Sequence, residues 1–214
     1  MKKLMFILVC SMLLSSVAVA SPLMDFTQGK TAIDLTLYPS LDYHVTTNQG
    51  WKGTGDGIHN NYDIGITTGL GNKFALQYRQ FNPKSLQVGG DSNSFTYGQE
   101  LNVLYQIDKS FNVFICEQIG RYNQTFSKTE TKNNLQIGLI GSTQLDNNLS
   151  LFGTIGYGKD ISNYEVGLAY AVSKKVDLNV MYRDRKSTHL HYPATAIDLT
   201  SEVKGFGYGV TCKF

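Results

Sequence analysis

The residues best suited to chemistry in this sequence are its four histidines. His189 and His191 lie in the stretch KSTHLHYP, which begins with Lys186 and Ser187 and precedes Asp198. A histidine that is oriented by a carboxylate and placed near a serine can act as the general base of a hydrolytic reaction. Two histidines in alternate positions of an extended chain also face the same way, which suits a metal ion. The sequence supplies no clear third and fourth ligand, so we expect no metal site and no cofactor.

The other two histidines, His44 and His59, flank a polar stretch near residues 45–60, where Asp56 is close to His59 in the sequence. All four histidines therefore lie in segments that read as loops or as the ends of strands. Whether any of them reaches a carboxylate depends on the elements that hold these loops.

Alternation of apolar residues with small or polar residues is the dominant pattern of the chain, and helical spacing is nearly absent. It is clearest in the last segment, where one face carries Phe206, Tyr208, Val210, Cys212 and Phe214. The other face of that segment is glycine, threonine and lysine. The pattern predicts ten strands of about 9–11 residues, the length with which a tilted strand crosses a bilayer. Merging the short hairpin near residue 159 would give eight strands.

The predicted connections alternate in length. Tight turns fall near residues 71–73, 108–110, 146–148 and 173–175, and long polar segments fall near 45–60, 83–94, 122–132 and 187–200. Short turns at one end and longer loops at the other are typical of outer-membrane barrels. An even number of strands then places both termini on the short-turn side.

Aromatic residues of the apolar face gather at two levels, next to the tight turns and next to the long loops. They are Phe74, Tyr105, Phe111 and Tyr170 at the first level, and Tyr62, Tyr97, Tyr157, Tyr164 and Tyr182 at the second. Amphipathic rings prefer the two membrane–water interfaces. We therefore interpret these residues as two aromatic girdles.

The first part of the chain is typical of a secretory signal peptide over residues 1–20, with a short basic start, an apolar run and an A-x-A sequence. We expect a periplasmic segment at 21–30 and the barrel domain at 31–214. Loss of Lys2 and Lys3 from the 19 basic residues balances the 17 acidic ones, which argues against nucleic acid as a partner.

These features together resemble the small outer-membrane β-barrel proteins of diderm bacteria, over the whole of residues 31–214. The most specific motif is the C-terminal strand that ends in Phe214. The resemblance implies an all-β, transmembrane, antiparallel up-and-down barrel, partnered by outer-membrane lipid and lipopolysaccharide and inserted by the barrel assembly machinery. Related barrels that modify lipid A or cleave peptides use histidine with serine or aspartate. Neither Ser187 with His189, nor Asp56 with His59, nor His189 with Asp198 matches their patterns, so we expect no enzyme.

Charged residues on the inward face are expected to form a pairing network that fills a narrow lumen. They are Asp34, Asp63, Arg79, Glu100, Glu165, Asp177, Arg183 and Arg185. The predicted role is structural, or interaction through the loops. The alternatives are a narrow porin-like channel for ions or small solutes and a lipid A-modifying enzyme at the rim.

One residue does not fit the lipid-facing pattern, because the alternation that includes Phe111 leads to Glu117. A β-bulge near Cys116 would turn Glu117 inward, and this is the explanation that we favour. The alternative is a polar patch of Gln99 and Glu117 that contacts a second copy of the chain. Cys116 and Cys212 are predicted to lie on distant strands as free thiols.

Overall fold

The computed structural model describes residues 25–56, 61–81, 84–85, 94–124, 127–193 and 196–214. The predicted signal peptide at 1–20 lies outside the described residues. No helix in this part of the chain is long and apolar enough to cross a membrane.

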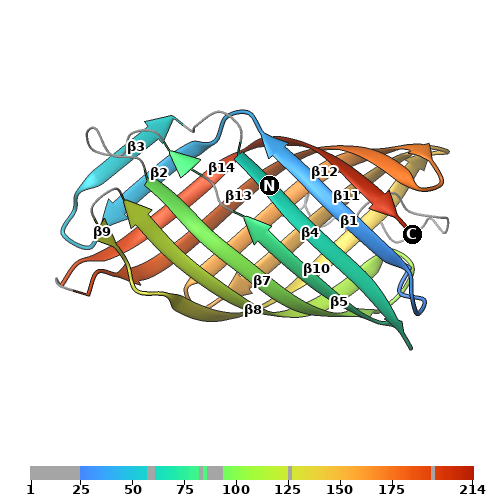
Figure 1. Ribbon diagram of the computed structural model, residues 1–214, viewed down its shortest axis with the longest axis horizontal. Coiled ribbons are helices and arrows are strands. Elements are labelled where there is room, and N and C mark those ends of the chain that lie inside the picture. Colours follow the sequence, from blue (N-terminus) through green and yellow to red (C-terminus); the bar gives the residue numbers. More distant parts are fainter. Residues whose placement is uncertain (1–24, 57–60, 82–83, 86–93, 125–126, 194–195) are drawn as a thin grey trace, which may run out of the picture.

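Ten long strands form a closed antiparallel sheet in which each strand pairs with the barrel strands before and after it. They are β1 (Thr31–Tyr38), β4 (Asn61–Gly71), β5 (Phe74–Phe81), β7 (Ser94–Gln106), β8 (Phe111–Gln124), β10 (Lys132–Asp146), β11 (Leu149–Gly158), β12 (Ile161–Ser173), β13 (Val176–His191) and β14 (Asp198–Lys213). Pairing of β1 with β14 closes the barrel (Figure 1). The predicted up-and-down, ten-stranded barrel is confirmed, and the eight-stranded alternative is wrong.

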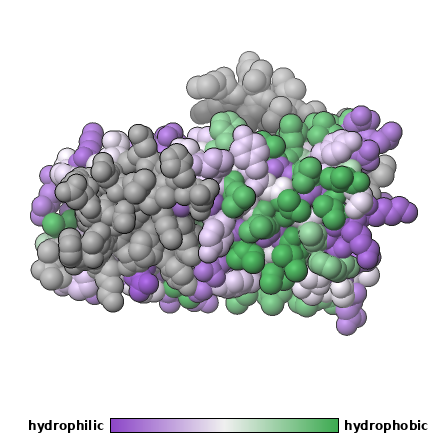
Figure 2. Space-filling view, turned by 45° about the horizontal axis from the view of Figure 1, so that its top comes forward, coloured by the Kyte–Doolittle hydropathy of each residue, from purple (hydrophilic) through white to green (hydrophobic). Residues whose placement is uncertain are grey.

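The polarity of the two faces is inverted relative to a water-soluble protein. On β4, the apolar residues Ile64 and Ile66 are exposed on the outer wall, whereas Asp63 and Thr67 are buried inside. Figure 2 shows hydrophobic side chains gathered on the outer wall and hydrophilic ones toward the ends of the barrel. An apolar outer band and a polar interior define a transmembrane barrel, because only lipid accommodates such a surface.

Tight turns join the strands at one end of the barrel, as predicted. In the turn between β4 and β5, Asn72 and Lys73 have φ angles of 50° and 69°, the left-handed conformation of a two-residue hairpin. The C-terminus lies at this same end (Figure 1). We call it the turn end, and we call the opposite end the loop end.

At the loop end the sheet extends further than the sequence predicted. The segment near 45–60 contains a hairpin of β2 (Asp42–Thr47) and β3 (Lys52–Asp56) instead of a polar loop. β2 pairs with β14 beyond the point where β1 leaves it. Two short strands, β6 (Lys84–Ser85) and β9 (Ser127–Lys128), pair with β7 and β8. In β2 the outward residues are polar and the inward residues Tyr43 and Val45 are apolar, so the polarity of the alternation is the reverse of that in the membrane strands.

The expected bulge near Cys116 is wrong. β8 pairs with both β7 and β10 without a shift in register. Cys116 is buried inside the barrel, and Glu117 is exposed on the lipid face. Cys116 and the partly exposed Cys212 are both free thiols.

Candidate functional site

The lumen is the first candidate site, and an apolar layer fills it at the turn end. This layer consists of Phe26, Ala75, Leu104, Phe114, Cys116 and Ile140. Phe26 comes from the segment before β1, whose backbone is fixed to the end of β4. Gly71 N donates to Phe26 O at 3.0 Å, and Gly69 N donates to Lys30 O at 2.7 Å. Sequence reasoning missed this plug, because a single apolar residue in a polar segment has no periodicity.

Gly69 shows how closely the plug lies against the wall. A Cβ atom at this position would lie 2.4 Å from the carbonyl oxygen of Thr27. Only glycine therefore lets residues 26–27 approach the strand. Residues 26–27, which we call the plug, therefore pack closely against the end of β4.

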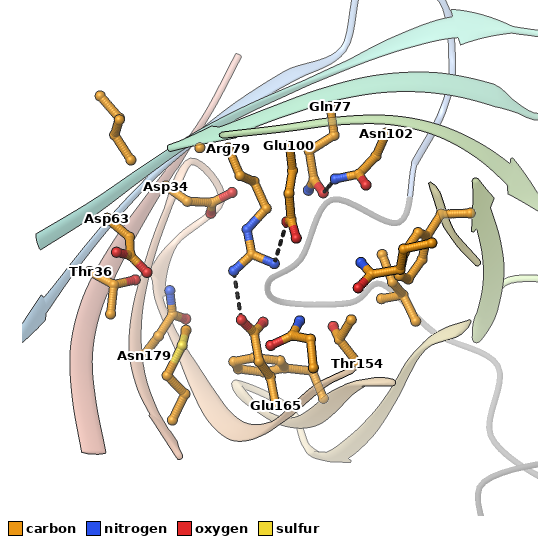
Figure 3. A pocket seen from close by; sticks show the side chains of 18 residues that line it. Asp34, Thr36, Asp63, Gln77, Arg79, Glu100, Asn102, Thr154, Glu165 and Asn179 are labelled. Atoms are coloured by element: carbon orange, nitrogen blue, oxygen red, sulfur yellow. Dashed lines mark hydrogen bonds and ion pairs between the residues drawn. The ribbon is translucent and has the colours of Figure 1, made fainter. Parts of the chain in front are cut away.

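A network of ion pairs forms the central layer of the lumen (Figure 3). Arg79 Nη2 on β5 lies 2.7 Å from Glu165 Oε1 on β12. Arg183 on β13 binds the same carboxylate through Nε at 2.8 Å and also pairs with Asp63 on β4. The guanidinium of Arg183 lies over the ring of Tyr38, 4.9 Å from its centroid. Each of these buried charges therefore has a partner of opposite sign, as burial requires.

A second branch of the network joins β7 to β13. Arg185 Nη2 lies 2.7 Å from Glu100 Oε1, and Arg79 Nη1 lies 3.9 Å from Glu100 Oε2. The guanidinium of Arg185 also stacks on the ring of Phe81, 3.6 Å from the centroid. β5 and β12, like β7 and β13, lie on opposite sides of the closed sheet. The Arg79–Glu165 and Arg185–Glu100 pairs therefore cross the lumen along its width.

The other two predicted lumen carboxylates lie apart from this network. Asp34 accepts a hydrogen bond from Thr211 Oγ1 at 2.5 Å and lines the central cavity. Asp177 lies at the turn end, 2.6 Å from Lys213 Nζ. Lys213 was not among the predicted lumen residues, although it shares the inward face of β14 with Thr211.

The space left between these side chains is small. The central cavity has a volume of about 60 Å³ and is lined by the ion pairs and by amides such as Gln77 and Asn102. Gln77 Nε2 donates to Thr67 Oγ1, and Asn102 Nδ2 donates to Gln77 Oε1, both at 2.9 Å. A cavity of this size holds a few water molecules, since one water needs roughly 10–15 Å³ of such space, and it leaves no room for a larger solute.

Inward glycines accept aromatic rings from neighbouring strands. A Cβ atom on Gly98 would lie 1.8 Å from the Phe81 ring, and one on Gly138 would lie 2.3 Å from the Phe114 ring. Gly167 faces Phe152 in the same way, at 2.5 Å. Gly98, Gly138 and Gly167 thus serve close packing of these rings.

A third, apolar layer closes the lumen toward the loop end. It includes Tyr38, Tyr43, Tyr122, Leu190 and Val203, all of them buried. Tyr43 belongs to β2, so the hairpin outside the predicted barrel contributes to this layer.

The histidines of the loop-end rim form two carboxylate pairs. His189 Nδ1 lies 2.7 Å from Asp160 Oδ1, and His191 Nδ1 lies 2.8 Å from Asp198 Oδ1. Asp160 also pairs with Lys132 Nζ at 2.8 Å. The combination of His189 with Asp198 that was considered for a peptide-cleaving barrel does not form, because a register shift between Ser187 and Leu190 turns the two histidines to different carboxylates. Within the described chain, no group of histidine, cysteine and carboxylate side chains could hold a metal ion.

His189 is the unusual residue of this rim, because its φ angle is 53°. A non-glycine residue rarely adopts this left-handed conformation, and histidine is among those that do so more often. Its side chain is 66% exposed, whereas that of Asp160 is 8% exposed. The buried carboxylate of Asp160 therefore holds the irregular end of β13 against the turn between β11 and β12.

Acid is expected to loosen this rim. Burial acts to raise the pKa of Asp160, but hydrogen bonds from Lys132 and His189 outweigh it and hold that pKa below its ordinary value of 3.8. A carboxyl whose pKa is lowered in the folded state adds stability above its unfolded pKa and loses it as the pH falls through the folded pKa. The protection of the amides at residues 187–190 against hydrogen exchange, taken relative to the intrinsic rate at each pH, should therefore fall below pH 3.8. In Asp160→Asn the exchange should be fast already at neutral pH and should show no such acid step.

The predicted aromatic girdles lie on the outer wall. Phe74 and Tyr105 stack at the turn end with ring centroids 5.1 Å apart, and Tyr182 and Phe206 stack nearer the loop end at 5.2 Å. Charged residues, Asp184 opposite Lys204, follow immediately beyond the second pair. This change marks the edge of the apolar band.

The remaining girdle and C-terminal residues are placed similarly. Exposed on the outer wall are Tyr62, Tyr157, Tyr164, Tyr170, Tyr208, Val210 and Phe214; Phe111 and Cys212 are half-buried. The side chain of Tyr97 lies outside the described part of the structure.

Comparisons with known proteins agree with this architecture. The outer-membrane protease OmpT from Escherichia coli matches with a TM-score of 0.57 and 12% identity, over 94% of this chain and 99% of that one. The translocator domain of the autotransporter NalP from Neisseria meningitidis matches with a TM-score of 0.50 and 12% identity, over 100% and 94% of the two chains. No protein-family model matches the chain, and no curated protein does.

The fold and the inverted polarity define the class of this protein: it is a small transmembrane β-barrel of the type found in bacterial outer membranes. Sequence identities near 12% support a shared fold and do not indicate a shared role. Its role has to be argued from its own lumen and rim.

Proposed function

We propose that the protein is a closed, non-conducting outer-membrane barrel that acts without catalysis, by presenting its loop end to partners outside the cell. This proposal rests on two ion pairs that cross the lumen between opposite strands, Arg79–Glu165 and Arg185–Glu100. A solute would have to break both, and would leave buried charges without partners. The apolar layers on either side add two further barriers.

The extended sheet at the loop end is the part of the molecule that is available to bind partners outside the membrane. β13 and β14 have 16 residues each, and β2 and β3 widen the sheet beside them. The outward residues there are polar, as in the Glu202–His44 and Lys204–Asp42 neighbours. Such a surface suits contact with polar partners in water better than contact with lipid.

This proposal places both termini in the periplasm. The C-terminus lies at the turn end (Figure 1), and outer-membrane barrels keep their short turns on the periplasmic side. The C-terminal strand, with Phe206, Tyr208, Val210, Cys212 and Phe214 on one face, supports insertion by the barrel assembly machinery.

Conductance in planar lipid bilayers tests the closed lumen. We expect no reproducible current steps from the folded protein, because the ion pairs and both apolar layers block the path. We expect the same silence from Phe26→Ala, in which the central ion pairs remain. Reproducible steps from the unmodified protein would contradict the proposal.

A channel gated by the N-terminal segment is the second candidate. The observation in its favour is that Phe26 is the one residue of the turn-end layer that no strand contributes. Steps from Phe26→Ala, with silence from the unmodified protein, would establish this channel in place of the closed barrel. Folding of both proteins should be verified first by the different gel mobility of native and boiled samples.

A further inference from the structure

Three polar residues interrupt the apolar outer wall on adjacent strands. Gln80 on β5 pairs directly with Gln99 on β7, and Glu117 on β8 lies diagonally next to Gln99. Each of the three lies the same number of residues along its strand from a residue of the turn-end girdle: Gln80 from Phe74, Gln99 from Tyr105 and Glu117 from Phe111. The three residues, which we call the polar belt, therefore lie at nearly one level of the bilayer.

The other barrel strands have no counterpart of this belt. Their outward residues at the corresponding distance from the turn end are Leu37, Ile64, Leu139, Ile155, Tyr164, Tyr182 and Tyr208. All of these are apolar or aromatic. The polar residues are thus confined to one side of the barrel, over β5, β7 and β8.

Hydrogen bonds within the chain leave part of the belt unsatisfied. Gln99 Nε2 donates to the hydroxyl of Tyr78 at 2.8 Å, and this hydroxyl lies 3.4 Å from Gln80 Oε1. Among the described residues, the carboxylate of Glu117 has no hydrogen-bond or ion-pair partner. A carboxylate that faces lipid alone is unfavourable, although at this level, which it shares with Tyr164 and Tyr182 of the loop-end girdle, the cost is smaller than at the middle of the bilayer.

We propose that the polar belt is the interface between two copies of this chain. A two-fold axis parallel to the membrane normal and passing over β7 exchanges left and right on the facing walls. It brings Gln99 opposite Gln99 of the second copy, and Gln80 opposite Glu117 of the second copy. Glutamine amides donate and carboxylates accept, so the two Gln80–Glu117 pairs and the central Gln99 pair satisfy one another.

The chemistry of the belt favours a second copy over a lipid headgroup. The Glu117 carboxylate repels the phosphates of lipopolysaccharide. An amide donor at the same level of a second copy binds this carboxylate. The order Gln80, Gln99, Glu117 across adjacent strands supplies that donor at the symmetric position. The belt is therefore complementary to itself.

Cysteine cross-linking in native outer membranes tests this interface. In a Cys212→Ser background, Gln99→Cys lies on the proposed axis and should form a disulfide-linked dimer under mild oxidation. Ile155→Cys, at the matching level on β11, faces away and should remain monomeric. A folded Gln99→Cys that stays monomeric, or that cross-links no better than Ile155→Cys, would overturn the proposal.

A second variant separates the interface from chance collision. Glu117→Leu removes a carboxylate from the lipid face, so it should leave the folded band intact or strengthen it. In the proposed dimer it also removes the acceptor for Gln80, and the cross-linked fraction of Gln99→Cys should fall several-fold. Unchanged cross-linking in the double variant would mean that Glu117 is not in the interface and would refute the pairing described above.

Discussion

Replacing Arg183 with methionine is expected to lower the free energy of unfolding by about 3–5 kcal/mol. Arg183 binds Asp63 and Glu165 and is itself buried. Glu165 keeps Arg79 when Arg183 is lost, but Asp63 loses the cation that compensates its charge. The cost therefore comes mainly from the uncompensated carboxylate of Asp63. Urea titration in detergent micelles, followed by the gel mobility of the folded form, measures the loss.

The matched control removes the carboxylate together with the guanidinium. In Asp63→Asn with Arg183→Met, no unpaired charge remains at this position, so most of the lost stability should return. A double-mutant cycle over the four proteins gives the coupling between the two side chains. A double variant as unstable as Arg183→Met alone would show that Asp63 is not the source of the cost.

Replacing Gly138 with alanine is expected to destabilise the barrel by about 3 kcal/mol, the upper part of the range for overpacking. A Cβ atom there would lie 2.2 Å from the carbonyl oxygen of Ile155 and 2.3 Å from the ring of Phe114. The oxygen belongs to a neighbouring strand of the closed sheet and cannot move without disturbing the pairing. The same urea titration measures the effect.

Gly65 provides the comparison, because it is also an inward glycine of a barrel strand. A Cβ atom at Gly65 would meet nothing closer than 3.6 Å, an ordinary van der Waals contact. Gly65→Ala should therefore unfold at nearly the same urea concentration as the unmodified protein. Equal losses in the two variants would mean that strand propensity, and not the contact with Phe114, explains the glycine at 138.

The two largest corrections to the sequence reasoning have a common origin. The β2–β3 hairpin was missed because it lies outside the apolar band, where outward residues such as Asp42 and Thr46 are polar. The bulge at Glu117 was expected because a carboxylate on the lipid face is unfavourable for a single barrel. The unbroken register of β8 keeps Glu117 on the outer wall. The position of this carboxylate therefore has to be explained by what contacts the outer wall and not by a backbone bulge.

The pairing within the lumen also depended on the closed sheet. The inward charges could be identified from their position in the alternation, since period two assigns each residue to a face. Their partners could not be identified in this way. Arg79 and Glu165 come together only because closure of the barrel places β5 opposite β12. The same holds for His189, which a local register shift turns toward Asp160.

The sequence by itself determined the class of fold, the ten membrane strands, the tight turns and the face on which most side chains lie. These follow from alternation and turn chemistry, which act between neighbours in the chain. Only the tertiary structure decided that Phe26 plugs the lumen and that ion pairs cross it. Each of these depends on distances between strands that are far apart in sequence, and closure of the barrel sets those distances.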